Sequence, residues 1–192
     1  MPENLLPVEA LLIIDIQTGN VTGSGAVPDA ARLLENAADL LDKARSSGAL
    51  VVHVQNDGPA GMSDETGTPG WELHLPVDPS ATELVIRKKV DDAFNGTLLA
   101  ALLHEHGVSS LAICGLMSEM CVSATARTAL SLGFRVVLPH DAHATTGIPP
   151  TPGISPEIPA ATVSRVAEWA LGNKITIPPH TSDVSFTTPL PT

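Results

Sequence analysis

The feature that most restricts the fold of this chain is a series of short apolar runs, rich in β-branched residues, that alternate with amphipathic segments. Each run has the length of a buried strand, and the segments between them have the periodicity of helices. The six expected strands begin at Leu11, Leu50, Glu83, Ser109, Phe134 and Lys174. The expected helices cover residues 29–48, 97–107, 118–133 and 158–173. This alternation predicts a three-layer, doubly wound (Rossmann-like) α/β fold, with a six-stranded parallel sheet covered by helices on both faces.

The composition fits one globular domain over residues 1–192, because 43% of the residues are hydrophobic and 16% are charged. A formal net charge of -11 argues against nucleic acid or an anionic membrane as a partner. No apolar run approaches the roughly 20 residues that span a bilayer, and the opening MPENLLPVEA lacks the basic start of a signal peptide. We therefore expect a cytoplasmic protein.

Ligands of a doubly wound sheet bind beyond the carboxyl ends of its strands. The candidate residues are therefore the polar ones that follow each apolar run: Asp15, Gln17, Asn56, Asp57, Lys88, Asp141 and His143, together with the turn at 114–121. Two long connections, 57–79 and 145–159, have the length of lids or binding loops. The last stretch, 180–192, is expected to be loosely held or to reach a partner subunit.

The two cysteines of the chain lie in different surroundings. Cys114 closes the run LAIC, where a small buried hydrophobic residue is its ordinary role. Cys121 lies three residues after Ser118, the expected N-cap, and therefore in the first turn of a helix. Backbone N–H groups and the helix dipole at that position favour a thiolate, although Cys121 could instead only pack against the sheet. A disulfide between the two is not expected in a reducing compartment.

Asp15 and Lys88 end two of the expected strands. A carboxylate at the end of a buried strand must be hydrogen-bonded, paired or functional, and Asp15 could alternatively cap a neighbouring loop. Lys88 could alternatively form a structural salt bridge with Asp91 or Asp92. Taken with Cys121, these side chains supply a nucleophile, its base and an electrostatic partner.

Four stretches of the chain resemble the isochorismatase-like cysteine hydrolases: LLIIDIQ, KKVDDAFNGTLL, ICGLMSEMCVSATARTALSLGF and VVLPHDAHAT. The resemblance covers nearly the whole length. It implies a catalytic triad of Asp15, Lys88 and Cys121, and a cis peptide bond between Leu116 and Met117. It also implies an oxyanion hole made by the backbone N–H groups of Met117 and Cys121.

The resemblance further implies a hydrolase acting on carbon–nitrogen bonds other than peptide bonds. The substrate would be a small amide, carbamoyl or lactam compound, cleaved through a thioester on Cys121. Vinyl ether hydrolysis of the isochorismatase type is an alternative, but family members with that activity often lack the cysteine. A non-catalytic small-molecule-binding protein and a redox-sensing thiol are further alternatives. Activities of the family include opening of the cationic streptothricin lactam, which an acidic rim would suit: Asp57, Asp91, Asp92 and Glu119.

We predict no metal and no other cofactor. Nicotinamidases of this family carry an Asp-x-His metal motif after the second strand, where this chain has VQNDGPAG. Six of the seven histidines are expected within a strand, isolated, or at the surface: His53, His74, His104, His106, His140 and His143.

The remaining expectations concern substrate contacts and assembly. Phe94 could equally be a core anchor, and Trp71 a lid, a subunit contact or a packing residue. The resemblance implies a homo-oligomer, a dimer or a tetramer. The expected substrate-contacting residues are Gln17, Asn20, Trp71, Phe94 and Glu119.

Overall fold

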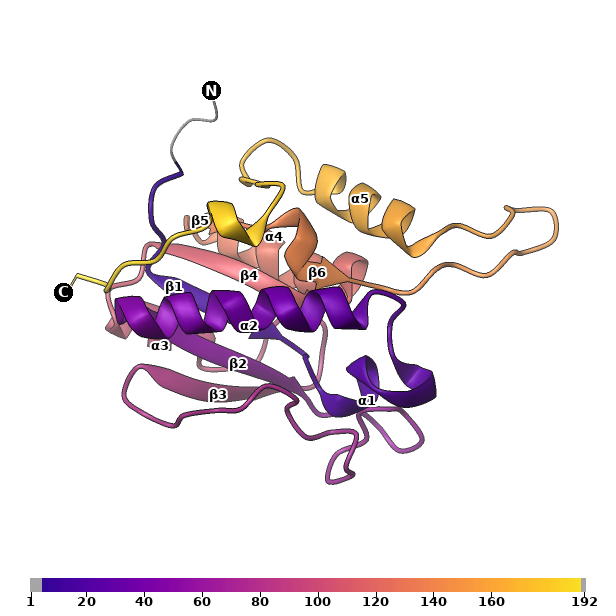
Figure 1. Cartoon of the computed structure of the whole chain (residues 1–192), viewed down its shortest axis with the longest axis horizontal. Helices are drawn as coiled ribbons and strands as arrows, with labels where there is room; N and C mark the ends of the chain where they lie inside the picture. The colour runs from indigo at the N-terminus through magenta and orange to yellow at the C-terminus, as the bar shows by residue number, and fades with distance from the viewer. Residues whose placement is uncertain (1–4, 191–192) are drawn as a thin grey trace.

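The computed structural model describes residues 5–190, and its centre is a parallel sheet of six strands (Figure 1). All pairings between these strands are parallel. In spatial order the strands are β3 (Glu83–Lys88), β2 (Leu50–Asn56), β1 (Ala10–Ile14), β4 (Ser110–Leu116) and β5 (Arg135–Val137), and the short β6 (His143–Ala144) also pairs with β4. The predicted fold class is confirmed.

The sixth strand differs from the one expected at residues 174–178. Within that run only Thr176 forms an isolated parallel bridge, to Val137 at the end of β5. Pro178 follows and has no N–H to continue the ladder, so the run adds a bridge and not a strand. The sixth strand is instead β6, where the chain returns to the end of β4.

The four expected helices are present, and each ends close to a glycine, as the sequence indicates. Gly48 terminates α2 in the left-handed conformation, with φ of 68°, and its N–H bonds to the carbonyls of Ala44 and Arg45. The long helices are α2 (Ala30–Ser47), α3 (Leu99–Glu105), α4 (Ser123–Ser131) and α5 (Ala160–Ala170). Shorter elements are α1 (Thr18–Val21), the 3₁₀ turns Gly23–Gly25, His140–Ala142 and Thr181–Asp183, and a π-helical turn at Ser118–Val122.

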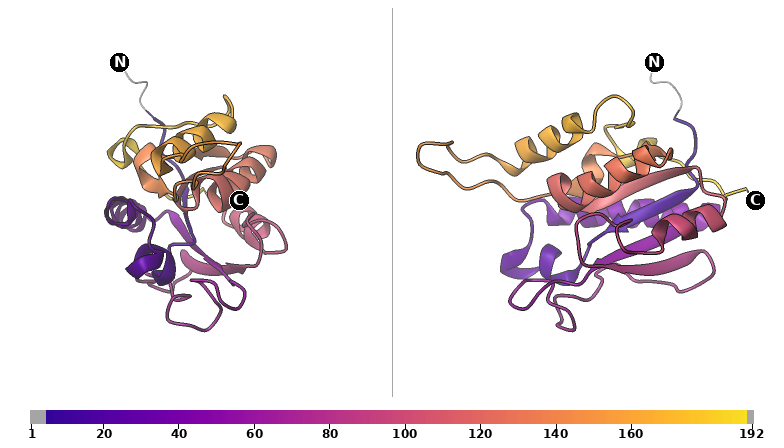
Figure 2. Two further views of the ribbon diagram at one scale, coloured as in Figure 1. Left: turned by 90° about the vertical axis from the view of Figure 1, so that its right-hand side faces the viewer. Right: turned by 180° about the vertical axis from the view of Figure 1, so that it is seen from behind.

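Helices lie on both faces of the sheet, as Figure 2 shows from two sides, and the central strands β1, β2 and β4 are buried on both faces, whereas the edge strand β3 has exposed side chains. Because side chains of a strand alternate, Leu11 and Ile13 of β1 pack with α2, whereas Leu12 and Ile14 pack with α3 and α4. The near-continuous apolar runs of the sequence are a consequence of this two-sided burial.

The segment after α5 is not the loose tail that we expected. Val184 and Phe186 are buried, Phe186 forms a parallel bridge with Val8, and the N–H of Thr187 donates to the carbonyl of Val8 at 2.9 Å. Residues 180–190 therefore pack on their own chain, and residues 191–192 lie outside the described part.

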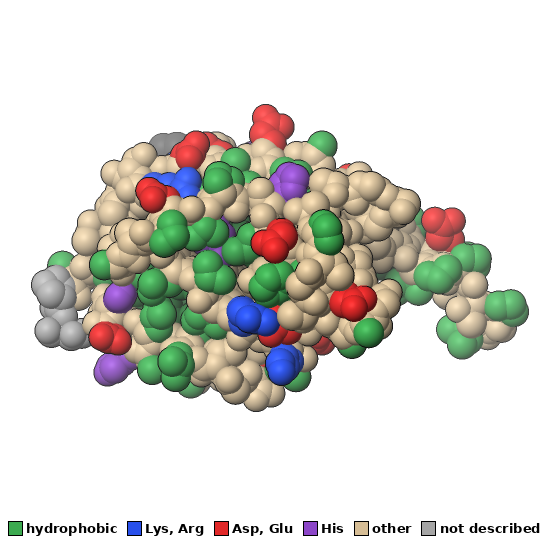
Figure 3. Space-filling view, turned by 90° about the horizontal axis from the view of Figure 1, so that it is seen from below, with side chains coloured by type: hydrophobic (Ala, Val, Ile, Leu, Met, Phe, Trp, Pro, Cys, Tyr) green, Lys and Arg blue, Asp and Glu red, His purple; other side chains and the backbone are tan. Residues whose placement is uncertain are grey.

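The connection between β6 and α5 forms an arm that projects from the body of the molecule (Figures 1 and 3). Ile148 pairs with Ile158 and Thr151 with Ser155, so the arm has the pairing of a narrow hairpin. Ile154 near its tip is 82% exposed. None of its residues lines the pocket described below. Among the described helices, none has the length and apolar character needed to cross a membrane.

Candidate active site

A hollow of about 220 Å³ lies at the carboxyl end of the sheet, where the rule for doubly wound folds places a ligand. Its lining residues lie at or after the ends of β1, β2, β3 and β4. Its lining is Asp15, Asn20, Asn56, Pro59, Met62, Ser63, Asp64, Asp91, Leu116, Met117, Met120 and Cys121.

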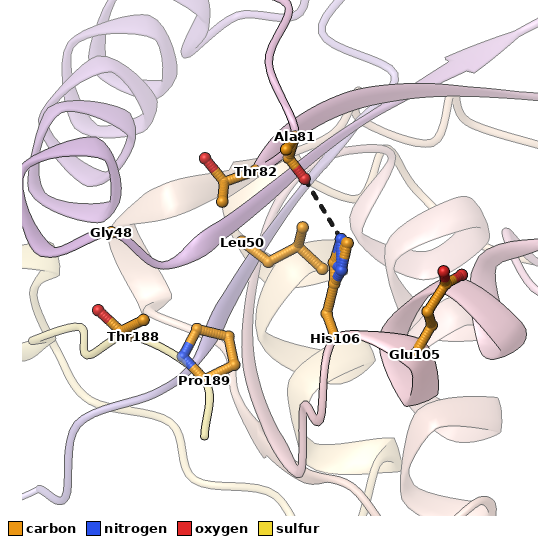
Figure 4. A pocket seen from close by; sticks show the side chains of 8 residues that line it. All are labelled: Gly48, Leu50, Ala81, Thr82, Glu105, His106, Thr188 and Pro189. Atoms are coloured by element: carbon orange, nitrogen blue, oxygen red, sulfur yellow. Dashed lines mark hydrogen bonds between the residues drawn. The ribbon is translucent and has the colours of Figure 1, made fainter. Parts of the chain in front are cut away.

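A larger hollow, of about 470 Å³, lies at the starts of β2 and β3, near the end of α3 and the C-terminal segment (Figure 4). Its polar side chains include His106, whose Nε2 lies 3.3 Å from the carbonyl of Ala81. No cysteine, aspartate or lysine lines it among the described residues. Its size therefore does not make it the candidate site, because the smaller hollow contains the reactive groups.

Lys88 connects the other two members of the predicted triad. Its Nζ lies 2.7 Å from Oδ2 of Asp15 and 3.2 Å from Sγ of Cys121. A third contact, at 3.3 Å, is to Oδ1 of Asn56. Lys88 is 2% exposed, whereas Lys89 is exposed and points away, as the alternation of an extended chain requires. The structure thus brings Asp15, Lys88 and Cys121 together from three separate parts of the chain.

Asp15 occupies an unusual backbone position directly after β1. Its φ of 52° lies in the left-handed region, which aspartate adopts more readily than most residues but still at a cost. Its N–H donates to the carbonyl of Val54 on β2. Within the described part of the chain, the buried Oδ1 of Asp15 has no hydrogen-bond partner. One carboxylate oxygen is therefore held by Lys88 and the other is left available to accept a proton.

Burial dominates the ionisation of this pair. Desolvation raises the pKa of Asp15 to about 6, although the charge of Lys88 acts in the opposite direction. Burial alone would lower the pKa of Lys88, but the neighbouring Asp15 and Cys121 raise it above its ordinary value. Lys88 is therefore a fixed positive charge, while Asp15 changes its protonation state close to neutral pH.

The surroundings of Cys121 in the folded chain act against the thiolate that its position in a first turn favours. Burial raises its pKa well above the ordinary value, and the charge of Asp15 raises it further, while Lys88 lowers it. The other cysteine, Cys114, is fully buried with a pKa raised to about 12 by desolvation, and both cysteines are free, as predicted.

The turn that carries Cys121 begins with a cis peptide bond between Leu116 and Met117. Gly115 precedes it with φ of 126°, and a Cβ at this position would overlap the carbonyl oxygen of Ile14 on β1. Only glycine therefore fits the close approach of β4 to β1. The prediction that Ser118 is the N-cap is wrong, because Met117 occupies that position without a side-chain cap and the Ser118 hydroxyl bonds elsewhere.

Two histidines expected at the surface form a cluster with Glu168 of α5. His143 is 1% exposed, so its surface assignment was wrong, whereas His140 does reach the surface. Oε1 of Glu168 lies 2.6 Å from Nδ1 of His140 and 3.0 Å from Nε2 of His143. These donor atoms are of types that bind metals and lie within 4.8 Å of one another, but their separations are those of direct hydrogen bonds. The absence of a metal requirement stays a prediction.

Of the expected substrate-contacting residues, Asn20 lines the pocket, where its Oδ1 accepts a hydrogen bond from Ser63 at 2.8 Å. Gln17 is buried behind the pocket. Its side-chain amide donates to the carbonyls of Asn56 and Trp71 and accepts from the N–H of Asn56. Gln17 therefore fixes the loop after β2 and does not line the hollow.

Trp71, Phe94 and Glu119 lie away from the pocket lining. The indole of Trp71 donates to Asp57 at 3.1 Å and lies under the guanidinium of Arg87, 4.8 Å from the ring centroid. Phe94 stacks on Phe134 with ring centroids 6.2 Å apart, the core role that we considered as its alternative. Glu119 borders a separate apolar hollow against α5.

The acidic rim has a different composition from the one expected. Asp57 pairs with Arg87, and Asp92 accepts hydrogen bonds from Thr128 and from the N–H of Phe94, so neither lines the hollow. Asp91 does, and its Oδ1 lies 3.8 Å from Sγ of Cys121. Sequence reasoning missed Asp64, which is nearly buried in the long loop and accepts a hydrogen bond from Asn56 at 2.7 Å.

Comparison with known proteins decides the family. The isochorismatase domain model matches residues 9–149. The chain belongs to the isochorismatase family. Two proteins of Streptomyces noursei named streptothricin hydrolase are each 59% identical to it, over 94% and 95% of this chain and 71% and 66% of their own lengths.

More distant members of the family agree in sequence and in structure. Maleamate amidohydrolase of Pseudomonas putida is 34% identical over 67% of this chain and 68% of its own length. The crystal structure of an isochorismatase from Pseudomonas putida superposes with a TM-score of 0.83, at 32% identity, over 94% of this chain and 93% of that one. The family predicted from the sequence is confirmed.

Proposed function

We propose that the protein is a cysteine-dependent hydrolase that cleaves a carbon–nitrogen bond of a small amide, carbamoyl or lactam substrate. As an isochorismatase-family member related to streptothricin hydrolase and maleamate amidohydrolase, the chain is a hydrolase acting on carbon–nitrogen bonds other than peptide bonds, as predicted. The observation that carries the mechanism is the contact of Lys88 Nζ with both Asp15 and Cys121 at the pocket. The triad remains part of the proposal.

The first step transfers the thiol proton of Cys121 to the free oxygen of Asp15. The negative charge of Asp15 is one reason why the thiol pKa is high, so protonation of Asp15 removes that obstacle and leaves Lys88 facing the thiolate. The thiolate then attacks the substrate carbonyl. The backbone N–H groups of Met117 and Cys121 are the proposed donors to the oxyanion, and such a donor contributes about 2.7 to 4 kcal/mol to lowering the barrier.

The second step breaks the carbon–nitrogen bond. Asp15 returns its proton to the leaving nitrogen, which departs as an amine or ammonia and leaves a thioester on Cys121. A water molecule gives its proton to Asp15 and attacks the thioester, and the released thiolate takes that proton back. Lys88 stays charged throughout, so it compensates the negative charge that moves between Asp15 and Cys121.

The electrostatics of the pocket support a cationic substrate, and the streptothricin lactam is the specific candidate. Besides Cys121 and Asp15, whose negative charge Lys88 balances, the ionisable residues that line the hollow are Asp64 and Asp91. A positively charged amide would thus be attracted to the site, whereas an anionic one would be repelled.

The test of the mechanism is removal and trapping of the nucleophile. With streptothricin as the probe, Cys121→Ala should lower turnover by at least about 10⁴-fold, because no other group can form the acyl intermediate. Mass spectrometry of acid-quenched wild-type enzyme should locate an acyl adduct on Cys121. Cys114→Ala is the matched control and should retain both turnover and the adduct, since Cys114 is fully buried. Normal turnover by Cys121→Ala would refute covalent catalysis.

A further inference from the structure

A buried chain of hydrogen bonds runs from α5 to the turn that carries Cys121. Oε1 of Glu168 lies 3.0 Å from Nε2 of His143, and Nδ1 of the same ring lies 2.8 Å from Oγ of Ser118. Oγ of Ser118 also lies 2.9 Å from Oγ of Ser164 on α5. Glu168, His143 and Ser118 are each no more than 2% exposed. The chain thus links one helix to the residue three positions before Cys121.

The acceptor character of Glu168 assigns a consistent direction to the bonds of this hydrogen-bonded chain. Burial raises the pKa of Glu168, but hydrogen bonds from His143 and His140 lower it below the ordinary value, so Glu168 is a carboxylate and an acceptor. Nε2 of His143 donates to this carboxylate, and the tautomer with its hydrogen on Nε2 accepts at Nδ1 from the hydroxyl of Ser118. The oxygen of Ser118 accepts in turn from Ser164. Each member has a partner, which makes the chain rigid.

The order serine, histidine and carboxylate is that of a nucleophilic triad, but its placement excludes that role. Ser118 is 2% exposed and does not line the pocket, so a substrate carbonyl cannot reach its hydroxyl. The remaining role is positional: the hydrogen bonds with His143 and Ser164 hold the backbone at Ser118 in place.

These side-chain hydrogen bonds supplement the backbone bonds that the turn makes at its own start. Residues Ser118–Val122 form one π-helical turn, and Met117 at its N-cap makes no side-chain cap bond. The N–H groups of Met120 and Val122 both donate to the carbonyl of Met117, at 3.1 and 3.2 Å. A shift of about 1 Å in a catalytic group can cost about 100-fold in rate, so the position of this turn matters for the reaction.

We propose that Ser118, His143 and Glu168 are positioning residues, which hold the turn so that Cys121 meets Lys88 and Asp15. The proposal rests on the proposed function, since it takes Cys121 as the nucleophile. Ser118 lies in the turn that carries Cys121, His143 in β6 and Glu168 in α5. None of the three lines the pocket, so β6 and α5 would support the site from outside it.

The experiment compares Ser118→Ala with Ser118→Thr, which retains the hydroxyl. Streptothricin turnover gives kcat and KM, and the rate of Cys121 alkylation by iodoacetamide as a function of pH reports the position and ionisation of the thiol. Ser118→Ala should lower kcat about 10- to 100-fold, with KM changed by less than about 3-fold, and should displace the alkylation profile. Ser118→Thr should stay within about 3-fold of wild type on both measures.

Two further variants separate positioning from a loss of stability. Val163→Ala removes buried packing from α5 without touching the hydrogen-bonded chain, so it should lower the melting temperature and keep the wild-type alkylation profile. Glu168→Gln alters the hydrogen bond to His143 with little change in side-chain volume. It should displace the alkylation profile in the same direction as Ser118→Ala, but by less. It provides the test if Ser118→Ala does not fold.

The outcomes are distinct. Wild-type kcat and alkylation profiles in Ser118→Ala and Glu168→Gln would overturn the positioning role, as would an equal loss in Val163→Ala. If no amide is hydrolysed by the wild-type protein but Ser118→Ala still displaces the alkylation profile, the positioning role is supported and the proposed hydrolase function fails. Cys114, which is fully buried, serves as the unlabelled internal reference.

Discussion

Asp15 and Cys121 control one another's ionisation at the level of single side chains. Asp15 raises the pKa of the Cys121 thiol, whereas the hydrogen bond with Cys121 lowers the pKa of Asp15, and the positive charge of Lys88 balances one negative charge on the pair. The resting site therefore holds one proton between the carboxylate and the thiol. This arrangement gives a base that is active near neutral pH without exposing a permanent thiolate to oxidation.

The raised pKa of Asp15 predicts the acidic limb of the pH profile. Asp15 must be ionised to accept the thiol proton, so kcat/KM should fall as the pH drops through about 6. Asp15→Asn should lower kcat about 10²- to 10⁴-fold and abolish this limb. Steady-state rates between about pH 4.5 and about pH 8 test this, with Asp57→Asn as a control that should keep the limb. A limb near pH 4 in wild type would contradict it.

The raised pKa of Asp15 also makes the stability of the fold depend on pH, in the direction opposite to the activity. The folded state binds the Asp15 proton more tightly than the unfolded chain, whose value is near 3.8. The stabilising contribution of Asp15 is therefore complete below that value and is lost as the pH rises through about 6. Activity and stability thus depend on opposite protonation states of one residue.

Sequence reasoning found the residues that end strands and missed those in long loops. Asp15 and Lys88 were predicted because a charged side chain next to a buried run is costly without a role. Asp64 lies in the middle of a long connection, where no periodicity indicates which side chain turns inward. The pKa of Cys121 could not be predicted either, because burial and the neighbouring Asp15 are properties of the folded chain.

At the level of elements, the approach of β4 to β1 determines where the nucleophile lies. Gly115 pairs with Ile14. The cis peptide bond follows directly, between Leu116 and Met117, and the π-helical turn begins at Ser118. The alternation of strands and helices was readable from apolar periodicity, which long elements preserve. The π-helical turn and the two-residue β6 are too short to leave such a signal.

Gly115 should therefore be far less tolerant of substitution than other glycines of positive φ. Gly115→Ala places a methyl group against the carbonyl of Ile14 and should destabilise the fold by more than about 3 kcal/mol. Gly96→Ala is the matched control, because φ is 70° there and no atom lies within 4 Å of the added methyl group. It should cost about 1 kcal/mol. Urea denaturation measures both, and equal losses would contradict the close-packing argument.

At the level of the whole molecule, the formal charge of -11 and the acidic pocket act in the same direction. The field of the protein concentrates cations near its surface, and the acids at the hollow extend that field to the reacting groups. The charge count was evident from sequence, but the pairing of Asp57 with Arg87 and the inward position of Asp64 were not. Net charge alone therefore did not identify the residues that face a substrate.

The salt dependence of catalysis tests this electrostatic attraction. Raising sodium chloride from about 0.05 M to about 0.5 M should lower kcat/KM several-fold for a cationic amide, because screening shortens the range of the attraction. A neutral amide should change by less than about 2-fold. Asp91→Asn should weaken the dependence for the cationic substrate. Identical salt profiles for the two substrates would argue against attraction by the pocket acids.

The pairing of β1 with β4, which are distant in the sequence, also bears on how the catalyst comes into being. A nascent or partly unfolded chain in which these strands are still apart has an ordinary, solvated cysteine and no base beside it. Catalytic competence is consequently gained only when the central sheet closes, so a chain in which these strands are apart has no assembled catalytic centre.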